Sequence, residues 1–143
     1  MSGTDFGLIV EQYHRALDAV VRGDPAPMQD LISRRDDVTL ANPLGPPVRG
    51  WSQVKETMER AVSHLREGEP NHFERISGDV GTDLAYIVEV ERTRMKVGGS
   101  DEVSSISLRV TTIFRLEDGV WKVLHRHADP ITSPRSIESI IQA

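Results

Sequence analysis

The sequence contains no cysteine. Disulfide frameworks, thiolate zinc sites and cysteine nucleophiles are therefore excluded, and the absence is compatible with a reducing compartment. Aromatic residues are also few, at 5% of the chain, but the hydrophobic fraction of 38% and the charged fraction of 27% are typical of a globular protein. The 143 residues show no internal repeat, so we expect one domain that buries its own core.

Long apolar runs and clusters of basic residues are missing as well. No run approaches the roughly 20 apolar residues that cross a bilayer, and the start of the chain lacks the features of a secretory signal. We therefore expect a cytoplasmic protein without a membrane partner. The formal charge of −5 and the scattered lysines and arginines argue against a nucleic-acid partner.

Apolar residues at helical spacing predict three helices in the first half of the chain. The first runs from Phe6 to about Val21. A short second helix follows Asp24-Pro25, where the aspartate is the expected N-cap. The third begins after Gly50, includes Leu65 and stops at Gly68.

Alternating residues predict strands over 38–42, 71–76 and 84–97 and a long hairpin over 105–130, with tight turns at 78–83 and at Asp118-Gly119. This order of elements favours an α+β fold in which helices cover one face of a curved, mostly antiparallel sheet, forming a cone with a pocket. The core covers about 6–130. The tail, 131–143, has a helix start at Ser133-Pro134 and a small isoleucine stripe, which either docks on a neighbour or frays.

The strand faces follow from the turns. If the loop after residue 97 is symmetric about Ser100, Val90 lies opposite Val110 and Val88 opposite Thr112. Under that register the inner face holds, from residue 86 onward, Tyr86, Val88, Val90, Val110, Thr112, Phe114, Trp121, Val123, His125 and His127. The outer face then holds Glu89, Glu91, Arg109, Thr111 and Arg126. A shift of one residue would bring these charges into the pocket and remove the histidines.

The pattern resembles the nuclear transport factor 2-like superfamily, and in particular its SnoaL-like branch, which includes relatives of ketosteroid isomerase. The resemblance rests on Arg22-Gly23-Asp24, the segment from Pro47 to Trp51, the turn over 78–83 and the segment from Asp118 to His127. It implies a curved sheet with a pocket, homodimers through the outer sheet face, and as a rule no metal or organic cofactor. Members include isomerases, cyclases, dehydratases, epoxide hydrolases and proteins that only bind or scaffold. This chain lacks the pair of inward aspartates of ketosteroid isomerase.

His125 and His127 are the candidate catalytic residues, because a neutral imidazole is a natural general base near neutral pH. The alternative is that each is a core histidine that a hydroxyl or carbonyl satisfies. A metal held by His-x-His would need further ligands that the sequence does not offer, so no metal is expected.

Tyr13 is the third catalytic candidate, since a hydroxyl on the first helix could donate to a developing oxyanion; core packing is the alternative reading. Asn42 could orient a substrate carbonyl or cap the following loop. The remaining residues expected to line the pocket are Trp51, Tyr86, Val88, Val110, Thr112 and Trp121.

Two hypotheses follow. The first is a cofactor-independent isomerase, cyclase or lyase that uses histidine acid-base chemistry on a small hydrophobic molecule, with His127 moving the proton and His125 orienting it. The second is a module that binds a small ligand unchanged or only dimerises. A cavity with both imidazoles exposed in it would favour the first.

Overall fold

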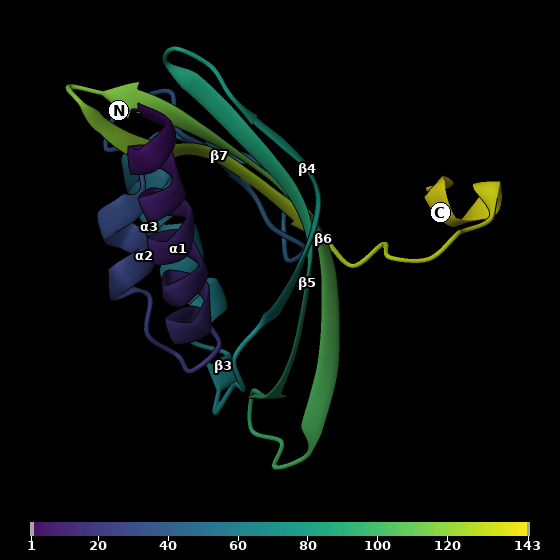
Figure 1. Ribbon diagram of the computed structural model, residues 1–143. Coiled ribbons are helices and arrows are strands. Elements are labelled where there is room, and N and C mark those ends of the chain that lie inside the picture. Colours follow the sequence, from purple (N-terminus) through teal and green to yellow (C-terminus); the bar gives the residue numbers. More distant parts are fainter. Residues whose placement is uncertain (1, 143) are drawn as a thin grey trace.

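The computed structural model describes residues 2–142, with side chains from Phe6 onward. Three helices, α1 (Ser2–Val20), α2 (Ala26–Leu31) and α3 (Trp51–Val62), lie within the concave side of a curved sheet (Figure 1). The strands are β1 (Thr39–Ala41), β2 (Val48–Arg49), β3 (Leu65–Arg66), β4 (His72–Val80), β5 (Leu84–Val97), β6 (Val103–Glu117) and β7 (Val120–Asp129). The α+β fold predicted from the order of the elements is confirmed.

The sheet order is β2-β1-β7-β6-β5-β3, and β4 pairs with the other stretch of the β5 edge. The β1–β7 pair is parallel and the other pairs are antiparallel. The parallel pair extends the curved sheet beyond β7, because it brings β1, the short strand after α2, beside β7. The buried apolar side chains of α1, α2 and α3 pack on the inner face of this sheet.

The ends of α3 and of β4 differ from the sequence prediction. Helix α3 ends at Val62, and Leu65 with Arg66 forms β3, where they pair with Val97 and Lys96. Gly68 is therefore no helix cap; it lies so close to Val21 that a Cβ would overlap that side chain. Strand β4 also extends to Val80, so the predicted turn over 78–83 is shorter than expected.

The register between β5 and β6 is shifted by one residue from the prediction. Glu89 lies opposite Val110 and Ile87 opposite Thr112, because the pairing of Lys96 with Val103 centres the connection between Gly99 and Ser100 and not on Ser100. The side chains of Ala85, Ile87, Glu89, Glu91 and Met95 are therefore buried on the inner face. The expectation that Tyr86, Val88 and Val90 point inward is wrong.

A β-bulge changes the facing of β7. Asp118 and Gly119 form the expected tight turn with positive φ, and Trp121 and Val123 are buried as predicted. Phe114 then pairs with Val123 but Ile113 pairs with His125, so Leu124 has no partner on β6. Because one extra residue reverses the alternation, Arg126 and Ala128 share the inner face beyond the bulge, and His125 and His127 do not.

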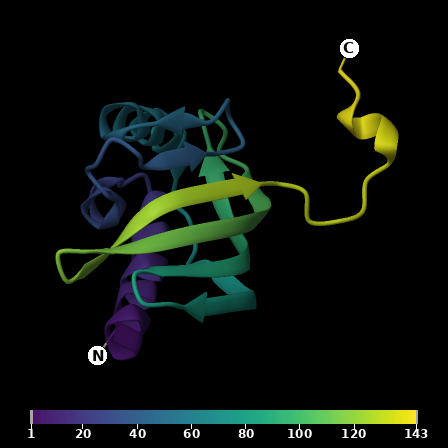
Figure 2. The same cartoon turned by 90° about the horizontal axis from the view of Figure 1, so that it is seen from above.

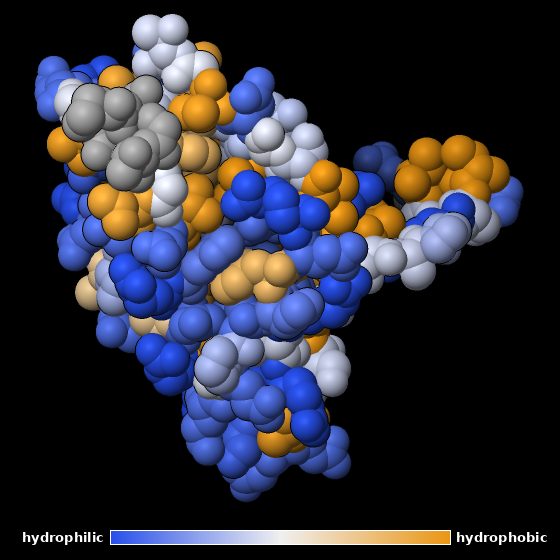
Figure 3. Space-filling view, viewed as in Figure 1, coloured by the Kyte–Doolittle hydropathy of each residue, from blue (hydrophilic) through white to orange (hydrophobic). Residues whose placement is uncertain are grey.

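The C-terminal tail leaves the body and ends in a short 3-10 helix, Ile137–Ile140, that lies apart from the rest of the chain (Figures 1 and 2). In and directly after this helix, Ile137, Ile140 and Ile141 are 68–71% exposed and form an apolar patch at the end of the projecting tail (Figure 3).

Candidate functional site: a cavity with one buried ion pair

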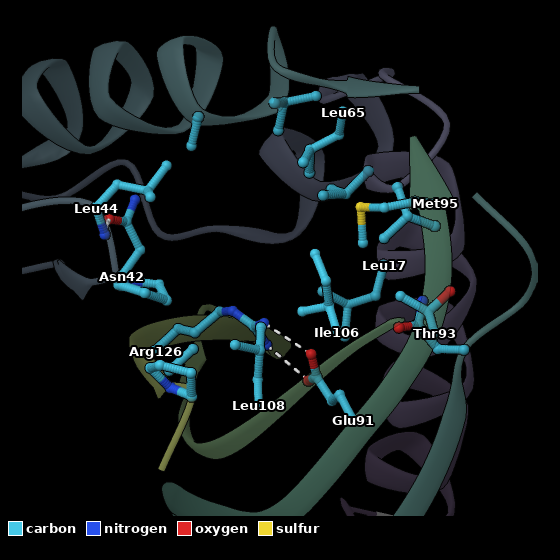
Figure 4. Close-up of a pocket in the computed structure, with 18 of the residues that line it drawn as sticks. Leu17, Asn42, Leu44, Leu65, Glu91, Thr93, Met95, Ile106, Leu108 and Arg126 are labelled. Atoms are coloured by element: carbon cyan, nitrogen blue, oxygen red, sulfur yellow. Dashed lines mark hydrogen bonds and ion pairs between the residues drawn. The ribbon is translucent and has the colours of Figure 1, made fainter. Parts of the chain in front are cut away.

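A cavity of about 650 Å³ lies between the helices and the inner face of the sheet. Its walls are mostly apolar and come from α1, α3, β3, β5 and β6, including Leu17, Met58, Leu65, Met95, Ile106 and Leu108 (Figure 4). The polar residues in the lining are Asn42, Asn71, Glu91, Thr93, Ser105, Ser107, Arg126 and Thr132. Only Glu91 and Arg126 among the lining residues carry a charge.

Glu91 and Arg126 form a bidentate ion pair. Arg126 Nη2 donates to Glu91 Oε1 at 2.8 Å, and Nη1 donates to Oε2 at 2.9 Å. Glu91 is 4% exposed, so both groups are largely removed from water and hold each other in one orientation. Burial alone would lower the pKa of Arg126, but the Glu91 carboxylate and Tyr13 outweigh it, and the pKa is raised. Arg126 therefore keeps its charge.

The Tyr13 hydroxyl group holds this ion pair in place by hydrogen bonding. Arg126 Nη1 donates to the Tyr13 hydroxyl at 2.6 Å, and that hydroxyl also shares a hydrogen bond of 2.6 Å with Thr112 Oγ1. Tyr13 is fully buried and does not line the cavity. Burial raises the pKa of Tyr13 to about 12, although the nearby Arg126 charge partly opposes the shift. The hydroxyl stays protonated and positions Arg126.

The raised pKa of Tyr13 predicts a loss of stability in alkali. The protonated phenol is favoured in the folded state, so its contribution is present below the unfolded value of 10.0 and is lost as the pH rises towards 12. We expect the free energy of unfolding to fall by roughly 1 kcal/mol per pH unit over this range, relative to a Tyr13→Phe variant. Urea unfolding of both proteins at several pH values measures this difference. Parallel curves for the two proteins would contradict the assignment.

A second buried carboxylate fixes α1 to the sheet. Glu89 accepts hydrogen bonds from His14 Nε2 at 2.8 Å and from Arg75 Nε at 2.9 Å, and the His14 ring stacks on Phe73 with 3.7 Å between centroids. Burial alone would raise the pKa of Glu89, but the two hydrogen bonds outweigh it and the pKa is lowered. This cluster lies outside the cavity lining and holds α1 above it.

The two candidate histidines lie on the outer face. His125 Nδ1 forms a hydrogen bond of 2.7 Å with Thr39 Oγ1. His127 Nε2 lies 3.3 Å from Asp129 Oδ2, and about half of the His127 side chain is exposed. Burial, followed by the charge of His127, lowers the pKa of His125. The prediction that both imidazoles face the cavity is wrong, because Leu124 is unpaired.

Among the other predicted residues, Asn42 lines the cavity, and its Oδ1 accepts from Leu44 N at 3.0 Å, as expected for a loop cap; its role toward a substrate stays a prediction. Trp51, Val110, Thr112 and Trp121 lie outside the lining. Trp51 instead packs under Arg34, whose guanidinium carbon is 4.1 Å from the ring centroid. Tyr86 is on the outer face and hydrogen-bonds Ser77.

The sequence prediction missed Glu91 and Arg126, which it placed on the outer face. A usable signal existed at the odd positions of β5: Ala85, Ile87 and Met95 are apolar and mark the buried face, which Glu91 shares. The apolar residues at the even positions of the same strand obscured that signal.

The curved sheet around three helices, with a cavity between them, defines a cone-shaped α+β pocket protein. The family model described as "SnoaL-like domain" matches residues 9–132, and the chain belongs to this family. A search of curated proteins finds no match.

Solved structures support the same fold. A nuclear transport factor 2-like superfamily protein from Salmonella enterica is 15% identical with a TM-score of 0.75, covering 96% of this chain and 99% of that one. A ketosteroid isomerase-like protein from Erwinia carotovora is 16% identical with a TM-score of 0.71, covering 87% and 92%. An NTF2-like protein from Pseudomonas putida is 20% identical with a TM-score of 0.66, covering 98% and 92%. These similarities show that the chain shares the fold of these solved structures.

Proposed function

We propose that this protein binds a small, mostly apolar organic molecule in the cavity, with a polar group of that molecule against the Glu91–Arg126 pair. The observation that carries the proposal is a cavity of about 650 Å³ whose apolar walls surround one buried ion pair. Ligand sites in proteins have this volume and this combination of apolar walls with a few fixed polar groups. The apolar walls supply affinity, and the ion pair supplies orientation.

Turnover of the bound molecule is the second candidate function. Glu91 is a buried carboxylate that lines the cavity, so it is placed to exchange a proton with a bound molecule in an isomerase-, cyclase- or lyase-type reaction. In this version the acid-base role that the sequence suggested for His125 and His127 passes to Glu91, and no cofactor is needed. The ketosteroid isomerase-like protein from Erwinia carotovora shares the fold.

Filling the cavity is expected to abolish binding. Ala61 lies on α3 and lines the cavity, so Ala61→Trp places an indole in the ligand volume without changing charge. We expect the wild-type protein to gain thermal stability from apolar aromatic ketones such as benzophenone, since a ligand that binds only the folded state stabilises it. Ala61→Trp should lose at least about nine-tenths of the affinity, which thermal shift and equilibrium dialysis measure.

The matched control is Gln53→Trp, which adds the same side chain at an exposed position of the same helix, outside the lining. This variant should bind like the wild-type protein. Equal binding by Ala61→Trp and Gln53→Trp would show that the probe binds elsewhere and would contradict the proposal.

We also propose a homodimer through the outer face of the sheet. Ile76 on β4 and Tyr86 on β5 are exposed there, and Val88 and Val90 lie on the same face. Exposed apolar patches on a sheet are typical of protein interfaces. Sedimentation velocity at micromolar concentration tests this, and a single monomeric species would contradict it.

No helix within residues 2–142 is long and apolar enough to span a membrane; the cytoplasmic location stays a prediction.

A further inference from the structure

Arg126 has unused hydrogen-bonding capacity. A guanidinium group carries five N–H donors. Two of the Arg126 donors bind the Glu91 oxygens and a third binds the Tyr13 hydroxyl. Within the described residues, the Nε–H and the second Nη2–H of Arg126 have no acceptor.

These two donors lie on the same edge of the guanidinium group. Glu91 occupies the edge formed by Nη1 and Nη2, and Tyr13 binds the remaining hydrogen of Nη1. The free Nε–H and Nη2–H are parallel, and such a fork fits an oxygen acceptor with two lone pairs. Figure 4 shows Arg126 bordering the open cavity while the end of its guanidinium group reaches Glu91.

The charge around this fork is already balanced. Glu91 neutralises Arg126, and every other residue in the cavity lining is uncharged. A ligand carboxylate on the free fork would stand beside the Glu91 carboxylate with one cation between two anions, within mostly apolar walls. A hydrocarbon would cover the two donors and leave them unpaired, which costs free energy.

From this balance we infer that the ligand is a neutral carbonyl compound, and that its carbonyl oxygen accepts from both Nε and Nη2 of Arg126. The inference rests on the proposed function, because it names the polar group of the molecule that the cavity binds. Tyr13 is then a positioning residue: its hydroxyl and Glu91 hold three donors of Arg126, so that the remaining two keep one direction.

The experiment compares three probes that share two phenyl rings: benzophenone, which has a neutral carbonyl, diphenylmethane, which has no oxygen, and diphenylacetate, which has a carboxylate. Equilibrium dialysis with the full chain measures the three affinities. We expect benzophenone to bind about ten-fold more tightly than either of the others, the factor that a net hydrogen bond from a charged donor supplies. This ranking needs no variant, so it does not depend on the folding of a mutant.

Arg126→Lys provides the second measurement. Lysine keeps the charge opposite Glu91 but lacks the second fork, so the preference for benzophenone over diphenylmethane should disappear. Circular dichroism of the variant checks that it is folded. A preserved preference in folded Arg126→Lys would overturn the inference.

The outcomes separate the inference from the proposed function. If diphenylmethane or diphenylacetate binds the wild-type protein as tightly as benzophenone, the cavity is a binding site but the carbonyl anchor is wrong. If none of the three binds, the proposed function itself fails.

Discussion

Replacing Arg126 with methionine is expected to lower the free energy of unfolding by about 3–5 kcal/mol, because removal of one partner leaves the other charge of a buried pair uncompensated. Glu91 is 4% exposed, and both of its oxygens accept from Arg126. The substitution also removes the donor to the Tyr13 hydroxyl. Urea unfolding followed by circular dichroism measures the change.

The control is the double variant Glu91→Leu with Arg126→Met. Because the apolar pair leaves no buried charge, we expect the double variant to be more stable than Arg126→Met alone and to approach the wild-type protein. It should nevertheless lose the preference for benzophenone. A double variant as unstable as Arg126→Met would mean that the cost came from lost packing and not from the unpaired carboxylate.

The second large effect is expected at Phe114, where alanine should cost about 3–5 kcal/mol. Phe114 is fully buried, and its ring makes edge contacts with the rings of Phe6 and Tyr13 at centroid distances of 5.1 and 5.4 Å. The cavity left by alanine would lie between α1 and β6. Thermal and urea unfolding measure the loss.

Leu84→Ala is the matched control, since Leu84 is a large apolar residue on the neighbouring strand with 48% of its surface exposed. We expect a change within about 0.5 kcal/mol there. Equal losses at the two positions would contradict the placement of Phe114 at the centre of the core.

Much of the fold could be predicted from local patterns. The helical spacing of Tyr13 and Leu17 on α1 and of Val54 and Met58 on α3 identified the buried faces that the structure has. Strand β5 begins and ends at the predicted residues, and the turn at Asp118-Gly119 is where the sequence placed it. Each of these features depends on residues close together in the chain.

The residues that line the cavity could not be predicted in the same way. Which side chains face inward depends on the exact pairing across the loop after β5 and across the bulge at Leu124. One extra or missing residue in the loop after β5 exchanges the faces of that strand, and the unpaired Leu124 exchanges the faces of β7. Glu91 and Arg126 were therefore assigned to the same face as each other but to the wrong one. Asn42 was placed correctly because β1 is short and regular.

The bulge at Leu124 also bears on how such a pocket can diversify. Ala128 and Arg126 face the cavity while His125 and His127 face away, and this division depends on a single residue that carries no functional group. If the same residues formed a regular strand without the bulge, His125 and His127 would share the inner face with Val123 in place of Arg126, without a substitution at any of these positions. Gain or loss of a β-bulge can thus exchange the chemistry of a pocket while every residue stays the same, which residue-by-residue comparison of two sequences would not record.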